Sequence, residues 1–134
     1  MTFEDLRREK YISLATFRKT GREVATPVWF AHDEDGSLVV VTGGDSGKVK
    51  RLRNSSRSRI AVCDFKGEVR DDAEWLETET LLVSDEAFVQ SAHGLLLKKY
   101  GWQMRLLDAV AWVGGRIPGR QYLRIGPAGA SPTP

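Results

Sequence analysis

Apolar and polar residues along the chain are arranged in several short segments as they are in β-strands. These segments are 11–17, 24–32, 38–42, 59–65, 75–84 and 121–125. Turn-forming residues separate the first three, with Gly21 in one turn and the sequence DEDGS in the next, which predicts an antiparallel meander. Pro27 cannot donate a hydrogen bond to a strand ladder, so its position should lie at a sheet edge, a bulge or a ligand.

Other segments have the composition or the spacing of helices. One or two helical turns are expected within 3–11, and a short helix opens at Gly47. Ser84 should cap a third helix, which ends at Gly101. A fourth follows over 102–113, with its apolar residues on one stripe: Trp102, Leu106, Ala109, Val110 and Val113. Mostly antiparallel strands with one short helix between them and a longer pair near the end predict a mainly β fold, a small β-barrel with flanking α-helices.

The length and composition of the chain predict one globular domain. Its 134 residues are 41% hydrophobic and 28% charged, which is ordinary for a soluble domain. We expect this domain over 1–126 and a disordered, proline-rich tail over 127–134. Cys63 is the single cysteine, which excludes an intrachain disulfide. No segment resembles a signal peptide or a membrane span, so we expect a cytoplasmic protein with no membrane partner.

A strongly basic helix follows the segment 38–42, in the stretch VVVTGGDSGKVKRLRN. Between Ser46 and Cys63 there are six cations and no acid: Lys48, Lys50, Arg51, Arg53, Arg57 and Arg59. Cations at a helix start oppose the helix macrodipole by about 0.3–1 kcal/mol each, so this arrangement calls for a bound anion. Backbone N–H groups, the hydroxyl of Ser46 as the N-cap and the ammonium of Lys48 together offer what a phosphate or carboxylate needs.

Two other interpretations of the basic stretch stay open. Lysine and arginine are good helix formers, so the helix could be a solvated basic surface. Its cations could instead follow the phosphates of a nucleic acid, although the net charge of +2 and the scarcity of interleaved aromatics weaken that class. A P-loop is excluded because Val49 stands where the motif needs serine or threonine after the lysine.

Few other residues suggest chemistry. Trp29 and Phe30 follow Pro27, and a flat cofactor ring could lie along that backbone, although at least one of the two should belong to the core. His32 and His93 have no partners at metal-ligand spacing, so no metal site is expected. No catalytic residue can be named, and an enzyme with this sequence would depend on a bound cofactor.

The order of four motifs resembles a known superfamily. These motifs are ATF followed by a turn and TPVWF, then LVVVT, then SGKVKRLRN, and then RIAVCDF. Together they resemble the FMN-binding split barrels, which include the pyridoxamine-phosphate oxidases. Within that superfamily the chain is most similar to the B group of flavin/deazaflavin oxidoreductases, which bind coenzyme F420. The later segment LLLKKYGWQMRLLDAV is similar to one compact branch of the group. The resemblance implies a six-stranded antiparallel split barrel and a homodimer with two cofactor sites at its interface.

The resemblance also implies which residues contact the cofactor. Those near its phosphate are Ser46, Gly47, Lys48, Lys50 and Arg51. Those along its ring are Thr26, Pro27, Val28 and Trp29, with Thr42 close to the ring or to its sugar-like chain. Trp75 would reach the site across the dimer interface. Arg53 and Arg57 would meet the carboxylates of the F420 oligoglutamate tail, which FMN lacks, so the acid-free cationic run favours F420.

The activity implied is hydride transfer between the deazaflavin and a small unsaturated or quinone-like organic molecule. An FMN-dependent oxidoreductase with the same phosphate site is the nearest alternative. A protein that binds F420 or flavin without turnover is a second alternative, and it would need the same basic cluster. Nucleic-acid binding is the third, and it predicts steep salt dependence with no response to flavins.

Overall fold

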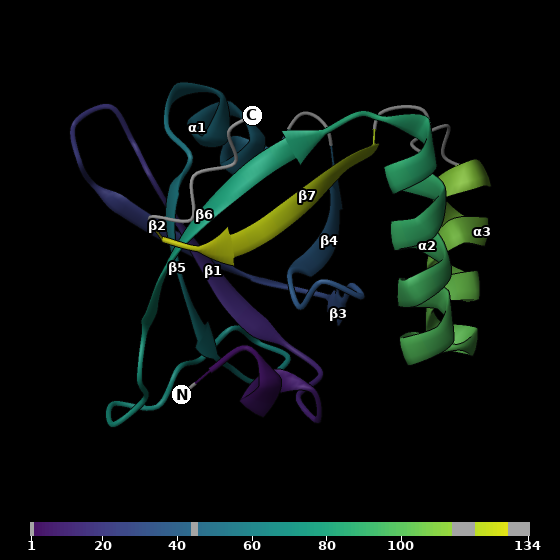
Figure 1. Ribbon diagram of the computed structural model, residues 1–134, viewed down its shortest axis with the longest axis horizontal. Coiled ribbons are helices and arrows are strands. Elements are labelled where there is room, and N and C mark those ends of the chain that lie inside the picture. The colour runs from purple at the N-terminus through teal and green to yellow at the C-terminus, as the bar shows by residue number, and fades with distance from the viewer. Residues whose placement is uncertain (1, 44–45, 114–119, 129–134) are drawn as a thin grey trace.

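The structure is a computed structural model of the chain, and it describes residues 2–43, 46–113 and 120–128. The strands are β1 (Ile12–Phe17), β2 (Glu23–Val28), β3 (Phe30–His32), β4 (Leu38–Gly43), β5 (Arg57–Val62), β6 (Leu76–Val83) and β7 (Arg120–Pro127). The helices are the short 3-10 helix η1 (Glu4–Leu6), α1 (Gly47–Asn54), α2 (Glu86–Tyr100) and α3 (Trp102–Val113). Figure 1 shows a curled sheet with α1 at one end and the pair α2 and α3 along one side.

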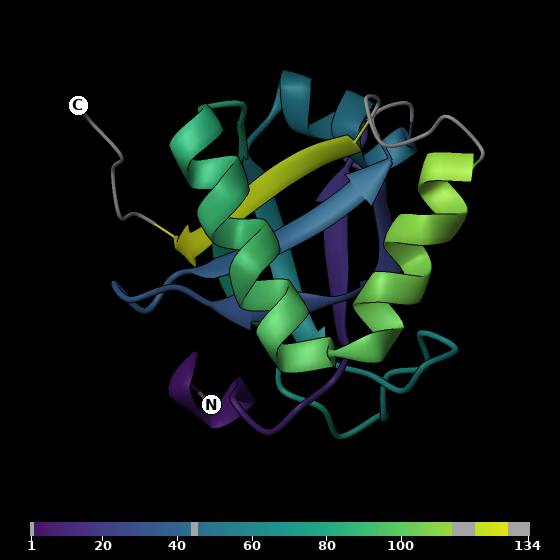
Figure 2. The same cartoon turned by 90° about the vertical axis from the view of Figure 1, so that its right-hand side faces the viewer.

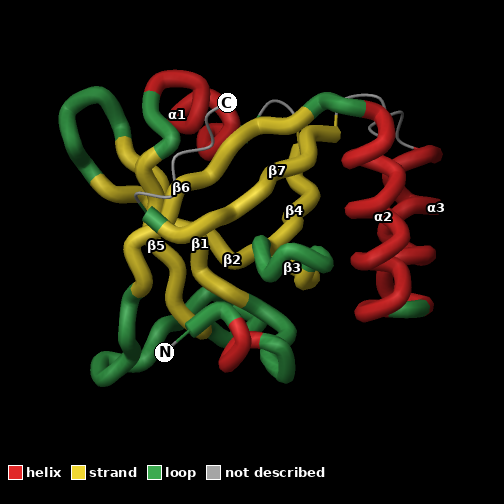
Figure 3. The backbone as a smooth tube through the Cα atoms, viewed as in Figure 1, coloured by secondary structure: helices red, strands yellow, loops and turns green. Residues whose placement is uncertain are grey.

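The sheet closes on itself through one interrupted strand. All its pairings are antiparallel, in the order β2-β1-β5-β6-β7-β4-β3. The two edge strands of that order, β2 and β3, are consecutive in the chain and only Trp29 separates them. The segment 23–32 therefore pairs with β1 through its first half and with β4 through its second. The result is a barrel whose wall is interrupted at Trp29. Figure 3 shows its strands in yellow, with α2 and α3 to one side of them.

The predicted mainly β fold with flanking helices is confirmed. The six predicted strand segments all form strands, but the prediction of one continuous strand over 24–32 is wrong, because the chain changes its partner strand at Trp29. Counting this interrupted strand once gives the six expected strands, and counting its halves separately gives seven. Pro27 lies on the edge strand β2, where its missing N–H is tolerated, as predicted.

Two apolar clusters hold the fold together. The first fills the barrel with inward side chains from most strands and with Leu6 and Leu52 from the helices that cover its ends. The second joins the outer face of β3, β4 and β7 to α2, and Figure 2 shows the two longer helices lying across that face. Leu96 and Met104 are fully buried in this second cluster. Burying side chains of this size contributes about 1.5–3 kcal/mol each, so α2 is a fixed part of the domain.

The start of α2 differs from its prediction by one residue. Asp85, not Ser84, caps the helix, and its carboxylate accepts a hydrogen bond of 3.0 Å from the backbone N–H of Phe88. Aspartate satisfies the free N–H groups of a first helical turn as well as serine does, so the sequence offered two adjacent candidates. The helix ends at Gly101, which has a φ of 59°, as predicted.

The helix over 102–113 forms as predicted, but its apolar stripe faces away from the barrel. Trp102 is 71% exposed, Leu106 56% and Val110 52%. Met104 provides the fully buried contact from this helix instead. Apolar residues at helical spacing show that one face of the helix is apolar. They do not determine whether that face packs on the barrel, because its direction depends on how α3 follows α2 at Gly101.

The last strand extends beyond the expected end of the domain at residue 126. Pro127 pairs with Thr78, and the backbone N–H of Ala128 donates to the carbonyl of Glu77 at 3.2 Å. The rest of the expected tail, 129–134, lies outside the described residues. No helix within the part of the chain that the structure describes has both the length and the apolar character needed to cross a membrane.

Candidate functional site

The interruption at Trp29 opens a split between β2 and β4. The ladder of β3 and β4 pairs Phe30 with Val40, and the same register continued would place Val28 opposite Thr42. The ladder stops at Phe30 instead, although β2 and β4 still approach within 8 Å between Cα atoms. Thr42 lies on the inward face of its strand, since it follows Leu38 and Val40 in alternation. The split therefore exposes the inner face of β4 beside the start of α1.

The first turn of α1 forms the other side of this split. Ser46 occupies the predicted N-cap position with extended backbone, but its hydroxyl caps no N–H group. That hydroxyl oxygen is buried and has no hydrogen-bond partner. Lys48, the second residue of the helix, donates from its Nζ to the hydroxyl of Thr42 at 3.0 Å. The structure thus places Thr42 in contact with Lys48 beside Ser46, and the predicted roles of these residues at a cofactor site stay predictions.

Lys48 is a half-buried cation without a carboxylate partner among the described residues. Burial, and after it the nearby guanidinium of Arg51, lowers the pKa of the Lys48 ammonium. The two cations approach because Gly47 has no side chain: a Cβ there would lie 2.7 Å from Nη1 of Arg51. Desolvated like charges disfavour each other, so an anion between them would remove an unfavourable interaction. A buried hydroxyl without a partner and two cations that no described carboxylate neutralises, all at a helix N-terminus, suit a phosphate group.

Arg51 is fixed by a group that sequence reasoning did not identify. Its Nε donates to the hydroxyl of Thr16 at 2.6 Å. Burial, and after it the charge of Arg18, lowers the pKa of Arg51. Thr16 is fully buried on β1, so this bond carries the guanidinium towards the end of the barrel.

The barrel interior below α1 is lined by hydroxyl groups. The hydroxyl of Ser58 lies 2.6 Å from that of Thr78 and 2.8 Å from that of Thr80, and all three residues are buried. Thr16 on β1 pairs with Ser58 on β5, and its hydroxyl accepts from Arg51. The row of hydroxyl groups therefore extends from Thr78 and Thr80 to Arg51. Serine and threonine at alternate strand positions were a detectable signal, but only sheet pairing places them on one face. These groups satisfy one another and position Arg51.

The residues predicted to contact a ring occupy three environments. Thr26 faces inward, and its hydroxyl oxygen is buried without a partner. Pro27 is exposed on the edge strand, whereas the side chain of Val28 belongs to the barrel core and leaves only its backbone available. Trp29 stacks on Tyr100 with ring centroids 4.5 Å apart and planes 9° from parallel. One face of Trp29 is therefore already covered by α2.

The remaining predicted residues lie apart from the split. Lys50 and Arg53 are exposed on α1, so both can meet a ligand only from solvent. Trp75 lies at the start of β6, where the guanidinium of Arg59 is 4.6 Å from its ring centroid. Arg59 also pairs with Glu23 at 2.7 Å. One chain does not bring Trp75 to Lys48, and its predicted contribution across a dimer interface stays a prediction.

No group of three or more histidine, cysteine or acidic residues that could hold a metal occurs among the described residues. Both histidines have other partners: Nε2 of His32 lies 2.7 Å from the carbonyl oxygen of Phe3, and Nε2 of His93 lies 2.9 Å from Asp108. Burial, and after it the charge of Asp64, raises the pKa of the Cys63 thiol to about 11. At neutral pH this thiol is protonated and weakly nucleophilic.

Lys99 is a second buried cation, which the sequence did not reveal. Its Nζ lies 3.4 Å from the ring centroid of Phe30 and has no hydrogen-bond partner. Burial lowers the pKa of the Lys99 ammonium to about 8, although the charge of Glu9 acts in the opposite direction. The amine lies between α2 and β3, beneath the stack of Trp29 and Tyr100.

The low pKa of Lys99 predicts a pH-dependent contribution to stability. The folded amine releases its proton near pH 8, whereas an unperturbed lysine keeps it to about 10.5. Between these values the unfolded state binds more protons, so the stability contributed by Lys99 rises with pH. We expect the native chain to become more stable relative to the Lys99→Met variant, in free energy of unfolding, as the pH rises from 8 to 10. Urea unfolding at each pH measures it, Lys98→Met is the exposed control, and a constant difference would contradict the assignment.

Several solved structures share this fold at low sequence identity. HutZ, the heme storage protein from Vibrio cholerae, aligns with a TM-score of 0.70 and 14% identity over 95% of this chain and 91% of that one. A proposed pyridoxamine 5′-phosphate oxidase from Listeria innocua aligns with a TM-score of 0.60 and 15% identity, over 92% and 87%. Atu2129 from Agrobacterium tumefaciens, of unknown function, aligns with a TM-score of 0.67 and 16% identity over 92% of this chain. The alignment covers 51% of the length of Atu2129.

The fold is a split barrel of the pyridoxamine-phosphate-oxidase type. The superfamily fold implied by the sequence motifs is thereby confirmed. No protein-family model matches the chain, and no curated protein matches its sequence. Identities of 14% to 16% establish the fold alone, so the placement of this split barrel in the F420-binding B group remains a prediction.

Proposed function

We propose that this split barrel is an oxidoreductase that binds coenzyme F420 with the cofactor phosphate at the start of α1. The observation that carries the proposal is the half-buried ammonium of Lys48, which has a hydroxyl partner and no carboxylate partner within 2–43, 46–113 and 120–128. A buried cation without a counter-ion is unfavourable, and a bound phosphate would neutralise it. The buried hydroxyl of Ser46, which lacks a partner, offers a further donor at the same helix start.

The residues of the split would bind and orient the cofactor. Lys48 and Arg51 would hold its phosphate, and Gly47 leaves room for the guanidinium. Thr42 would lie near the sugar-like chain, and the exposed backbone around Pro27 would line the ring. When bound, F420 supplies the hydride chemistry, and the protein contributes orientation and exclusion of water. No described side chain is assigned as a proton donor.

F420 is proposed over FMN because of the charge beyond the phosphate site. Arg53 and Lys50 are exposed on α1, where they can meet the glutamate carboxylates of the F420 tail. FMN has no such tail and would use the phosphate site alone. The homodimer and the contribution of Trp75 across its interface belong to the same proposal. Sedimentation velocity of the purified protein measures the assembly.

Titration of the purified chain with F420, FMN and hemin tests the cofactor. Hemin is included because HutZ, which has the same fold, stores heme. Binding is measured by the quenching of tryptophan fluorescence, to which Trp29 and Trp75 would contribute. We expect F420 to bind most tightly of the three. Tighter binding of FMN would be consistent with the proposed phosphate site, and the proposed cofactor would then be FMN instead of F420. Preference for hemin with no response to F420 would overturn the proposed activity.

The length of the F420 tail tests the role of the exposed cations. Removing glutamates from the tail should weaken binding, and it should do so more at low salt than at high salt, because exposed charges are screened. Arg53→Ala should remove most of this dependence on tail length, whereas Arg105→Ala, at an exposed position of α3, should not. Equal affinity at every tail length would contradict the assignment of Arg53 to the tail.

A further inference from the structure

A cavity lies at the opposite end of the barrel from α1. It has a volume of about 620 Å³ and is formed by the segment that follows β5. Its apolar surface comes from Val62, Val69 and Ala73 together with the protonated thiol of Cys63. This volume is within the range of small-molecule sites. The segment connects β5 to β6 below the barrel, away from the cationic helix (Figure 1).

This cavity adjoins the strand predicted to line the cofactor ring. Gly67, in the turn between the two halves of the lining, packs on Pro27: a Cβ at Gly67 would lie 3.0 Å from Cδ of Pro27. The lining ends at Glu74, and Trp75 follows directly. The cavity is thus bordered by Pro27 on one side and by Trp75 on the other. A cofactor whose phosphate lies at α1 and whose ring follows β2 would point its ring towards this end.

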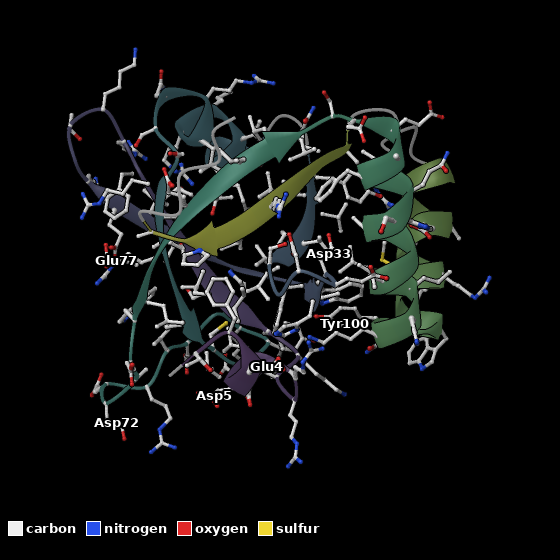
Figure 4. The ribbon with its side chains drawn as sticks, viewed as in Figure 1. Glu4, Asp5, Asp33, Asp72, Glu77 and Tyr100 are labelled. Carbon is white, nitrogen blue, oxygen red and sulfur yellow. The ribbon has the colours of Figure 1, made fainter. Side chains whose placement is uncertain are left out.

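The charges around the cavity are the opposite of those around α1. Its lining contains four acids, Asp64, Glu68, Asp72 and Glu74, and one base, Arg70, which gives a formal charge of 1 − 4 = −3. Figure 4 shows Asp72 on this lower edge of the molecule. The exposed ion pair of Arg70 with Asp72 is neutral overall, and, with Glu74 left out of the count, Asp64 and Glu68 still give the lining a formal charge of −2. The lining therefore favours a cation and disfavours an anion.

An exposed aromatic ring marks the edge of the same segment. Phe65 is 68% exposed, between Asp64 and Lys66. The carboxylate of Asp64 is fixed by two backbone N–H groups, those of Lys66 and Glu68, at 2.9 Å each. The turn is therefore ordered by Asp64 while its aromatic side chain is left in solvent. A large exposed aromatic beside an apolar cavity is typical of surfaces that contact a ligand.

We propose that this cavity binds an organic cation with an apolar body, and that such a molecule is the substrate class of the oxidoreductase. The second statement rests on the function proposed above, and the first stands without it. The apolar floor takes the body of the molecule, and the acids around it take its ammonium group. Phosphorylated and carboxylated organic molecules are excluded from this end by the same charges. The two sites near the ends of β2 thus bind opposite charges. An anionic cofactor binds at α1, and a cationic substrate binds in the cavity after β5.

The test uses two fluorescent probes and the full chain. Berberine, an aromatic quaternary ammonium, should bind saturably, and the apolar anion 1-anilinonaphthalene-8-sulfonate should bind at least tenfold more weakly. Ala73→Trp, which fills the cavity, should weaken berberine binding at least tenfold. Ala87→Trp, the same substitution at an exposed position of α2, should leave it unchanged. Should Ala73→Trp fail to fold, the double variant Glu68→Gln with Asp72→Asn should weaken berberine several-fold at low salt and spare the anionic probe.

The outcomes separate the cavity from the cofactor site. Unchanged berberine binding in Ala73→Trp, or equal binding of both probes, would overturn the proposal. A change in sedimentation mass in that variant would also overturn it, because the cavity would then be covered by a second copy of the chain. F420 binding retained in Ala73→Trp, with berberine lost, supports two separate sites. Berberine binding at this cavity in a chain that does not bind F420 would support the cation site and overturn its role in the oxidoreductase.

Discussion

Lys48→Ala should weaken the binding of F420 by about 1–3 kcal/mol, the loss expected for a charge-assisted hydrogen bond. The dissociation constant should therefore rise about five- to 150-fold. The physical reason is that Lys48 is half-buried, so its charge is screened less than that of an exposed lysine, and the Thr42 hydroxyl is its one side-chain partner in the part of the chain that the structure describes. Adding Lys50→Ala should increase the loss. Fluorescence titration of the purified variants measures the effect.

The controls for Lys48 separate binding from folding. Lys98→Ala removes an exposed lysine of α2 and should leave F420 affinity unchanged. The thermal midpoint of the Lys48→Ala protein without cofactor should change little, because the ammonium pairs with no carboxylate among the described residues. Unchanged F420 affinity in the single and double variants would contradict the proposed phosphate site at the start of α1. A loss of affinity that follows a lower thermal midpoint would point to folding instead.

Tyr100→Ala should destabilise the fold by about 3–5 kcal/mol, the range for removing a large buried aromatic side chain. Tyr100 holds the interruption in the barrel wall. Its hydroxyl accepts from the backbone N–H of Phe30 at 3.0 Å and lies 2.7 Å from the carbonyl oxygen of Lys10. Its ring stacks on Trp29. Figure 4 shows Tyr100 pointing from the end of α2 towards the barrel. Urea unfolding measures the loss.

Two variants divide the effect of Tyr100 into its parts. Tyr100→Phe keeps the stack and leaves the N–H of Phe30 without its side-chain acceptor, so it should cost about 1–3 kcal/mol. Trp102→Ala removes an aromatic of similar size that is 71% exposed, and it should cost less than about 0.5 kcal/mol. If Tyr100→Ala cost no more than Trp102→Ala, the split would be held by the strands alone.

The sequence was sufficient where a local rule was decisive. Alternation of apolar residues identified the strands, and the turn at Gly101 ended α2 where expected. The glycine-rich turn before Ser46 predicted the start of α1, and the run of cations after it indicated a candidate anion site there. These features depend on neighbours within a few residues, so the free energies that determine them can be read from a short window.

The sequence was insufficient where contacts join distant segments. The apolar stripe of α3 was identified, but not that Trp102 and Val110 would face solvent. Thr16 gave no sign that it would hold Arg51 at 2.6 Å, because 35 residues separate them. The cavity after β5 was also missed, since Val62 and Ala73 approach only when the connecting turn packs on Pro27.

The sequence by itself determined the elements of this protein, their order and the charge at the start of α1. Only the tertiary structure decided that the strand over 23–32 would divide its pairing between β1 and β4 at Trp29. That division opens the split beside the contact of Thr42 with Lys48. The physical reason is that strand pairing depends on the twist and closure of the whole sheet, whereas alternation along one strand specifies only which face is buried.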